Sequence, residues 1–432
     1  MGAILTWKEY VLGPIVLLIL YLIAIRRKRR YKGTPIERYF MPALHLRFIG
    51  AFLNALMYQY YYGGGDTFLY YAGVSSLWDS FFQDPSLYFE LVFRNPLEFS
   101  REALDFVFRY GHYRWSLYWF SVGPEAAVVK IGSLASLFAF KSYLGVSFVF
   151  SFFAFWGCWR LFKTFYYIYP SLHRRLAIAI LFVPSVFFWG TGLMKDPLCL
   201  GAIGLLTHAS YKLFILREKF WANSVIILIC IFILKETKIY IVISFLPALL
   251  VWLSLAYRSR IRNNFLRIMA TPFLFTVGLA AGLFLLMRVG SGAGKFSLST
   301  ALETVVVSQD YLKRQSIKAE GTYYDLGQME PTIQSALSFF PKGVNVTLFR
   351  PYLWEVIKVI NVPAAIESFL TLLLTLYVVF RTGPFRMLRA VFIDPQVLFC
   401  LTFSIIFAYA IGVSTYNYGS LVRYKIICMP FY

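Results

Sequence analysis

The stretch whose residue types most clearly suggest chemistry is Gly63-Gly64-Gly65-Asp66-Thr67, which follows an apolar run and three tyrosines. Successive glycines allow backbone conformations that other residues avoid, and they let a ligand approach the main chain. A carboxylate at the end of a membrane helix is costly unless it is used. Asp66 is therefore the candidate catalytic residue, as general base toward an acceptor hydroxyl or as ligand of a divalent metal ion. The alternative is a plain turn, because glycine and aspartate are common turn residues.

Other ionisable residues near the ends of apolar runs are candidates for binding a substrate phosphate. Lysine and arginine suit this role, arginine through its two-pronged guanidinium. The candidate substrate-binding residues are Lys195, Asp196, Arg350, Arg423, Lys425 and His112.

Each of these candidates also has a structural interpretation. Lys195-Asp196-Pro197 resembles a charged turn in which proline opens the next helix. Arg350 precedes a proline and could anchor a helix at the lipid headgroups. His112 suits a structural or interface position, and residues 235–238 are expected to form a solvated hairpin tip.

The composition identifies the class of protein. The 432 residues are 59% hydrophobic and only 15% charged, with a mean hydropathy of +0.64. Soluble domains are nearer half apolar and a quarter charged. We predict an all-α, polytopic membrane protein with about ten or eleven spans. The net charge of +21 is explained by basic loops between the spans, so no nucleic-acid partner is implied.

The basic loops also predict the topology. The first apolar run, residues 12–25, stops at Arg26-Arg27-Lys28-Arg29-Arg30, which marks the cytoplasmic side and leaves the N-terminus external. The second run then returns Asp66 to the external face. We expect one transmembrane domain over residues 1–432, with interfacial helices in an external loop at 63–125 and a second external loop at 288–355.

Several shorter runs remain open to interpretation. Residues 126–140 suit a half-span or re-entrant segment, and two short apolar runs, 225–234 and 239–256, flank the expected hairpin tip. The run at 424–432 is too short to span, so it either continues beyond this sequence or docks at the surface. The five cysteines lie in apolar runs without metal-binding spacing, and nucleotide-binding and protease motifs are lacking.

The arrangement resembles the GT-C superfamily of polytopic glycosyltransferases, which use sugars linked to polyprenyl phosphates. Members of that superfamily carry an acidic residue in the first external loop, as Gly65-Asp66-Thr67 does here, together with interfacial helices and a further late external loop. Pro184-Ser185, Phe188-Trp189, Lys195-Asp196 and Leu421-Val422-Arg423-Tyr424-Lys425 look like motifs of bacterial envelope proteins of this kind. Thr67 stands where many members have a second acid.

This resemblance implies transfer of a sugar from a polyprenyl-phosphate carrier to an acceptor at the external face of the bacterial inner membrane. Asp66 would act as base or metal ligand, and Lys195, Arg350 and Arg423 would bind phosphate. Two alternatives stay open. One is a polysaccharide polymerase or ligase that uses external arginines, and the other is a non-catalytic subunit of a cell-envelope complex with partner subunits.

Overall fold

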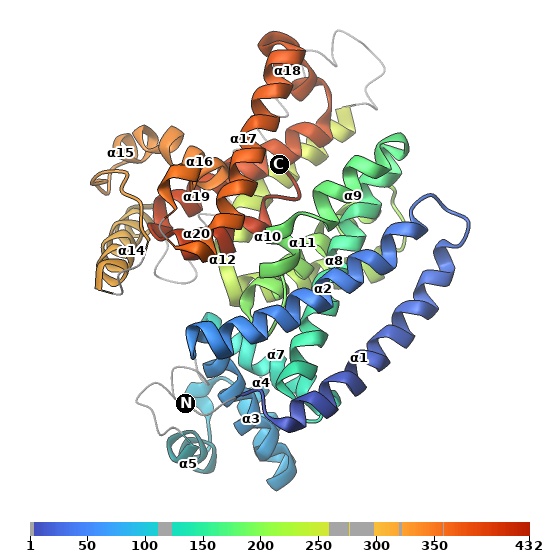
Figure 1. The fold of residues 1–432 in the computed structure, drawn as a ribbon, viewed down its shortest axis with the longest axis vertical. Helices are drawn as coiled ribbons and strands as arrows, with labels where there is room; N and C mark the ends of the chain where they lie inside the picture. Colours follow the sequence, from blue (N-terminus) through green and yellow to red (C-terminus); the bar gives the residue numbers. More distant parts are fainter. Residues whose placement is uncertain (1–3, 111–122, 259–275, 277–297, 319–321, 357) are drawn as a thin grey trace. The chain divides into compact units, whose positions relative to one another are not determined.

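The computed structural model describes residues 4–110, 123–258, 276, 298–318, 322–356 and 358–432 (Figure 1). Within these ranges the regular elements are helices, and the extended pairing is limited to an isolated antiparallel bridge between Tyr323 and Asn417. The all-α prediction is therefore confirmed. The chain divides into two compact units, Met1–Ile239 (unit 1) and Tyr240–Tyr432 (unit 2), where the sequence suggested a single domain.

Unit 1 combines long apolar helices with short connecting ones. Its first two helices are joined by the basic loop and form a hairpin (Figure 1). Short π-helical turns extend α2 and α11 at their C-terminal ends. The α-helices are α1 (Trp7–Lys28), α2 (Glu37–Leu56), α3 (Asp66–Gln83), α4 (Pro85–Phe93), α5 (Arg101–Tyr110), α7 (Pro124–Phe138), α8 (Tyr143–Ile168), α9 (His173–Leu181), α10 (Pro184–Trp189), α11 (Lys195–Ser210) and the first part of α12 (Phe220–Arg258).

Unit 2 contains the remainder of α12 and the C-terminal helices. The predicted external loop 288–355 is helical over much of its described length, and the last residues pack into the core, where Phe431 contacts the ring of Phe403. The further helices are α14 (Leu298–Lys318), α15 (Ile333–Ser338), α16 (Phe340–Phe349), α17 (Val362–Thr382), α18 (Pro384–Ile393), α19 (Pro395–Thr415) and α20 (Tyr418–Tyr424).

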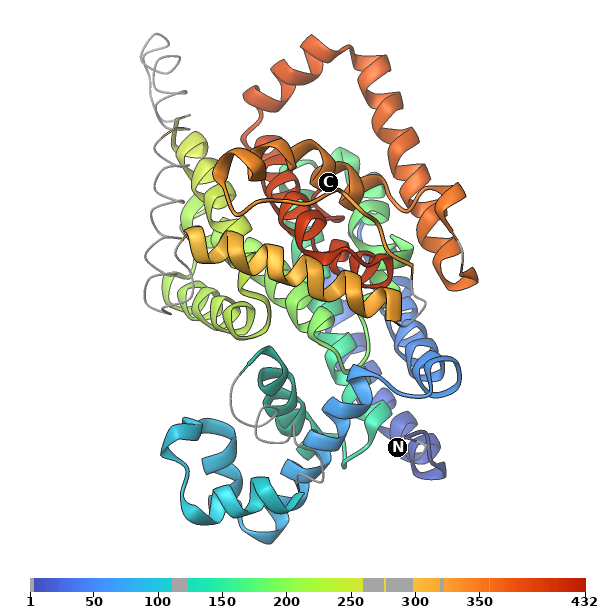
Figure 2. The same ribbon diagram turned by 90° about the vertical axis from the view of Figure 1, so that its left-hand side faces the viewer.

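Seven described helical segments are long and apolar enough to cross a membrane, so the chain is a multi-pass membrane protein. The predicted external loop at 63–125 contains the helices α3, α4 and α5 (Figure 2, light blue to cyan). The spans are Trp7–Tyr31, Glu37–Tyr62, Tyr143–Ile168, Lys195–Ile215, Phe220–Tyr257, Val359–Thr382 and Pro395–Thr415.

The sequence predicted about ten or eleven spans, and the described residues contain seven. Three apolar segments that do not form full spans explain part of this difference. The apolar run at residues 176–189, long enough in sequence to suggest a span, is divided into α9 and α10, because Pro184 cannot continue the preceding helix. The run at 126–140 forms the 15-residue α7. The two runs around 235–238 form the two parts of α12. The helix is interrupted between them at Lys238, whose φ and ψ are −147° and 79°. A further apolar run, residues 272–287, lies almost entirely outside the described residues.

Side-chain contacts define two ends of unit 1 and agree with the predicted alternation of the basic loops. At one end, Lys163 lies over the ring of Tyr31, and Lys212 lies over the ring of Tyr167. The basic residues that follow α1, α8 and α11 therefore share this end. At the opposite end, the buried carboxylate of Glu9 accepts hydrogen bonds from the first residues of α8. Asp66 follows the helix that returns from the basic end.

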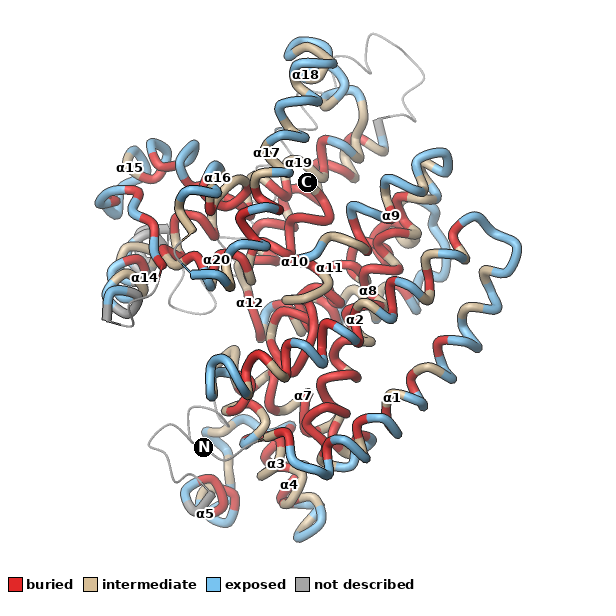
Figure 3. Tube along the Cα trace, viewed as in Figure 1, coloured by how far each residue is buried: buried red, intermediate tan, exposed pale blue. Residues whose placement is uncertain are grey.

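The centre of unit 1 is the contact between α8 and α11, which are largely buried (Figure 3). Glycines allow the two backbones to touch, as is common between membrane helices. A Cβ added at Gly157 would lie 2.2 Å from the carbonyl oxygen of Gly201, and one at Gly204 would lie 2.2 Å from that of Gly157. Any larger residue at these positions must push the helices apart.

We therefore expect Gly157→Ala to destabilise the protein by about 1–3 kcal/mol, the usual cost of overpacking. The measurement is the thermal unfolding midpoint of the purified protein in detergent. Gly13→Ala is the matched control, because its added methyl group meets a side-chain carbon of Leu144 at 3.1 Å instead of backbone. Equal midpoints for the two variants would contradict the close backbone contact.

Candidate functional site

Asp66 lies directly after the first returning membrane helix. The π-helical turn Met57–Tyr62 extends α2, and three glycines with positive φ then precede Asp66, the first residue of α3. At Gly65 a side chain is excluded twice, because φ is 119° and an added Cβ would lie 3.0 Å from the Tyr58 ring. The glycine stretch is thus a tight reversal that fixes where α3 begins.

The side chain of Asp66 is exposed, whereas the next residue is fully buried. Thr67 Oγ1 is 3.0 Å from the hydroxyl oxygen of Tyr143, which ties the start of α3 to the start of α8. The N-terminal dipoles of a helix favour a carboxylate in its first turn. Asp66 is therefore an accessible carboxylate on ordered backbone, and it can accept a proton from a hydroxyl group.

The described residues offer no set of protein ligands for the metal ion expected at Asp66. In the described part of the chain, no three histidine, cysteine, aspartate or glutamate side chains come together as metal ligands. Divalent ions that prefer oxygen take several such ligands, or one or two carboxylates with substrate and water. The described residues thus do not form a protein-only site, and no reaction step is assigned to a metal ion.

Lys195 and Asp196 open α11 and form two adjacent ion pairs. Lys195 Nζ lies 2.5 Å from a carboxylate oxygen of Glu125 on α7, and Asp196 accepts a 2.6 Å hydrogen bond from Lys238 Nζ on α12. The Asp196 and Lys238 side chains are only 1% and 6% exposed. We call the surrounding set the charge network; it consists of Glu125, Lys130, Lys195, Asp196, Lys235, Glu236 and Lys238.

The hairpin-tip interpretation of residues 235–238 is wrong at its last residue. Lys235 and Glu236 are exposed, but Lys238 is buried against Asp196. The cause is the helix interruption at Lys238. The non-helical backbone there directs the Lys238 side chain to Asp196, so that the ion pair joins α12 to α11. A buried charge requires such a partner, because an unpaired one is far too costly in an apolar environment. The neighbouring Thr237 hydroxyl bonds to the Ile233 carbonyl one turn earlier.

Lys130 differs from the other lysines of the charge network, because its ammonium group does not contact a carboxylate in the described part of the chain. It is half-buried, and no described carboxylate forms an ion pair with it. Burial lowers the pKa of Lys130, while the charge of Glu236 opposes that shift. The α7 helix that carries Lys130 packs on α3, where a Cβ at Gly73 would touch Val129. The helix that begins with Asp66 therefore also supports the charge network.

Two of the candidates in unit 2, Arg350 and Lys425, lie at a further ion pair. Arg350 Nε donates a 2.9 Å hydrogen bond to Glu355, and a second guanidinium nitrogen contacts the same carboxylate. The guanidinium carbon lies within 5.6–5.9 Å of the ring centres of Tyr324, Tyr352 and Tyr418. This arrangement combines a bidentate ion pair with cation–π contacts. The Arg350 fork is thus used inside the protein.

Lys425 is completely buried beside this ion pair. Its Nζ donates a 2.6 Å hydrogen bond to Ser368 and a longer one to the Arg350 carbonyl. Burial lowers the pKa of Lys425, and the nearby Glu367 opposes the shift. Lys425 therefore holds α17 to the C-terminal segment. Arg423 is half-buried at the end of α20.

The candidates fall into separate groups. Asp66, Lys195 and Asp196 belong to unit 1, and Lys195 and Asp196 are joined there to acids and lysines of other helices. Arg350, Arg423 and Lys425 belong to unit 2. His112 lies outside the described residues.

The sequence interpretation did not single out Arg47, which is fully buried in the middle of α2. Its guanidinium donates hydrogen bonds to the carbonyl oxygens of Val186 and Gly190, at 2.7 Å and 3.1 Å, and contacts the Cys158 sulfur. It thereby adds a second hydrogen bond to the Val186 carbonyl, which also accepts one from the Gly190 amide, and it binds the carbonyl of Gly190, the residue that follows α10. An arginine in the middle of a predicted apolar span was an available indication.

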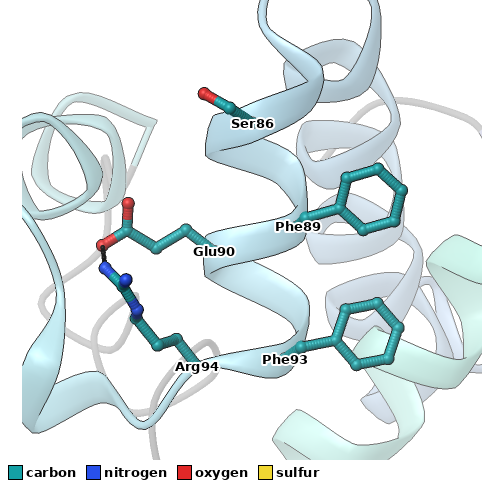
Figure 4. A pocket seen from close by; sticks show the side chains of 5 residues that line it. All are labelled: Ser86, Phe89, Glu90, Phe93 and Arg94. Atoms are coloured by element: carbon teal, nitrogen blue, oxygen red, sulfur yellow. Dashed lines mark hydrogen bonds and ion pairs between the residues drawn. The ribbon is translucent and has the colours of Figure 1, made fainter.

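A shallow hollow of about 420 Å³ on α4 has a different character (Figure 4). Two phenylalanine rings lie along one side of the helix, and Glu90 and Arg94 lie along another. Glu90 also accepts a 2.6 Å hydrogen bond from the Ser100 backbone, which holds its pKa below the ordinary value. Glu90 therefore braces the chain between α4 and α5. The lining residues are Ser86, Phe89, Glu90, Phe93 and Arg94.

Comparisons of the chain with protein-family models, with curated proteins and with solved structures find no match. The functional argument therefore depends on the residues themselves.

The buried pair in the charge network leads to a stability prediction. Lys238→Met leaves Asp196 buried without its partner, which should cost about 3–5 kcal/mol of unfolding free energy. Adding Asp196→Leu should recover most of that loss, because an apolar pair of similar volume needs no counter-charge. The unfolding free energies of the wild type, the two single variants and the double variant, measured in detergent, give the coupling energy between Asp196 and Lys238.

The exposed pair Asp310–Arg314 provides the control cycle and should give a coupling below about 1 kcal/mol. If the losses from Lys238→Met and Asp196→Leu simply add in the double variant, the buried pair does not act as a unit.

Proposed function

We propose that this protein is a GT-C-like glycosyltransferase of the bacterial inner membrane, with its N-terminus and Asp66 on the external face. The observation that carries the proposal is the accessible carboxylate of Asp66 at the start of α3, held by the glycine reversal at the end of a membrane helix. The donor would be a sugar on a polyprenyl phosphate and the acceptor a hydroxyl group. Such a donor is reached at the membrane surface, where Asp66 follows α2.

The reaction assigns a distinct role to Asp66. Its carboxylate takes the proton of the acceptor hydroxyl as that oxygen bonds to the anomeric carbon of the donor sugar. The bond from this carbon to the phosphate oxygen breaks, and the electron pair leaves with the polyprenyl phosphate. The leaving phosphate gains negative charge, so a nearby cation stabilises the transition state more than the ground state.

Lys130 is the best-supported cation in unit 1 for this leaving group. Lys195 and Lys238 are each neutralised by a carboxylate, whereas Lys130 is half-buried on the helix that packs against α3. Lys195 would reach phosphate after release from Glu125. Arg350 and Arg423 remain phosphate candidates in unit 2.

A second candidate function is a polysaccharide polymerase or ligase that works through arginine. It is favoured by Arg350, whose guanidinium is fixed by Glu355 and surrounded by three tyrosine rings. Aromatic rings and a fixed cation suit a chain of sugars attached to a lipid pyrophosphate. In that case Asp66 would be dispensable for the reaction. If the protein is instead a non-catalytic subunit, neither Asp66 nor Arg350 would be needed for sugar transfer.

We expect Asp66→Asn to preserve the fold and reduce sugar transfer by about 10²–10⁴-fold, the usual contribution of a positioned general base. The assay follows a labelled sugar from a polyprenyl-phosphate carrier to acceptor in proteoliposomes. Glu98→Gln is the matched control, since Glu98 is an exposed acid of the same external loop. Full activity of the Asn variant would remove Asp66 from the mechanism and favour the arginine-based alternative.

Lys130→Gln should shift the maximal rate of sugar transfer downward about tenfold or more, because a hydrogen bond to the charged leaving phosphate contributes roughly 1.5–3 kcal/mol and is strongest in the transition state. The same proteoliposome assay, run over a series of carrier concentrations, measures this shift. Lys8→Gln removes an exposed lysine of the same unit and should have no effect. Equal shifts in both variants would indicate a general loss of positive charge.

A further inference from the structure

The helix α18 is held at a membrane surface by its connections. Gly383 alone separates it from the span α17, and Asp394 alone separates it from the span α19. Figures 1 and 2 show α18 between these two helices. With joints this short, both ends of α18 must lie where the spans leave the bilayer. The basic residues Arg381, Arg386 and Arg389 identify this side as cytoplasmic.

The apolar side chains of α18 are exposed to an unusual degree. No residue of this helix is buried (Figure 3). Phe385 is 86% exposed. Leu388 and Phe392 are each 53% exposed. Their spacing of three and four residues places the three side chains on one face of the helix. An exposed apolar face of this kind is stable when other apolar groups cover it. Because α18 lies directly between the spans α17 and α19, the acyl chains of the bilayer are the apolar groups next to this face.

The charges of α18 specify the kind of lipid. The segment from Phe380 to Ile393 contains three arginines and no acidic residue. Arg389 and Arg386 lie beside the Phe385 face in the helical projection, where long basic side chains can reach lipid phosphates while the apolar face enters the membrane. Asp394 accepts hydrogen bonds from the first backbone amides of α19, so its carboxylate serves as a helix cap.

We propose that α18 is an amphipathic anchor that binds the anionic phospholipids of the cytoplasmic leaflet. Phe385, Leu388 and Phe392 enter the boundary between headgroups and acyl chains, and Arg386 and Arg389 bind headgroup phosphates. This is the composition of an interfacial helix, with an apolar face and basic flanks. Anionic lipids attract each basic residue near the surface, which corresponds to roughly a fivefold gain in affinity per residue.

The depth of α18 can be measured with the whole protein in lipid nanodiscs. Phe385→Cys provides a site for an environment-sensitive dye, because the native cysteines are buried or half-buried. Quenching by lipids that carry a spin label on the acyl chain should be strong at this position. Quenching should be weak at Arg314→Cys on α14, an exposed position in the external loop. A solvent-exposed dye at position 385 would overturn the proposal.

The lipid preference is tested by counting the phosphatidylglycerol retained around the protein in nanodiscs that also contain phosphatidylcholine. Arg386→Gln with Arg389→Gln should weaken this enrichment, about fivefold for each arginine. The matched control, Arg314→Gln with Lys358→Gln, removes the same charge from exposed positions outside α18 and should leave it unchanged. Restoring charge with Arg386→Lys and Arg389→Lys should restore enrichment. Unchanged enrichment in the double Gln variant would refute the lipid site.

Discussion

A charge inside an apolar helix bundle must have a partner, and this constraint organises both units. Water is not available in the bilayer interior to solvate an ammonium or a carboxylate, so each is retained only where another group compensates it. Unit 1 meets this requirement with Asp196 and Lys238, and with Arg47, which uses backbone carbonyls instead of an acid. Unit 2 meets it with the fully buried Lys425, which bonds to the hydroxyl of Ser368 and the carbonyl of Arg350.

These partnerships also explain why the helices are broken where they are. The interruption of α12 occurs at the residue that reaches Asp196, and the short α10 ends where the Arg47 guanidinium donates hydrogen bonds to the carbonyl oxygens of Val186 and Gly190. In a membrane, irregular backbone is tolerated when the protein satisfies its polar groups. The broken helices are therefore consequences of the same requirement as the ion pairs, and they place polar groups inside unit 1 without exposing them to lipid.

The architecture was largely predictable from sequence, and the pairings were not. Apolar run lengths indicated the helical membrane class, and the glycine stretch indicated the turn that comes before Asp66, where α3 begins. Lys195 and Lys238 were visible as charged residues, but their acids come from other helices, one of them 70 residues away. Sequence spacing carries no information on such contacts. The amphipathic character of α18 was masked because its arginines suggested only a basic loop.

Arg47 has a consequence for the order in which the protein is made. The first carbonyl that it binds belongs to a residue 139 positions later in the chain. At synthesis rates of about 5–20 residues per second, roughly 7–28 s separate the two residues at the ribosome. During that interval α2 carries an unsatisfied cation, so its midsection must remain in contact with water, lipid phosphate or the insertion machinery. The closing of unit 1 around Arg47 is thus timed by the arrival of α10.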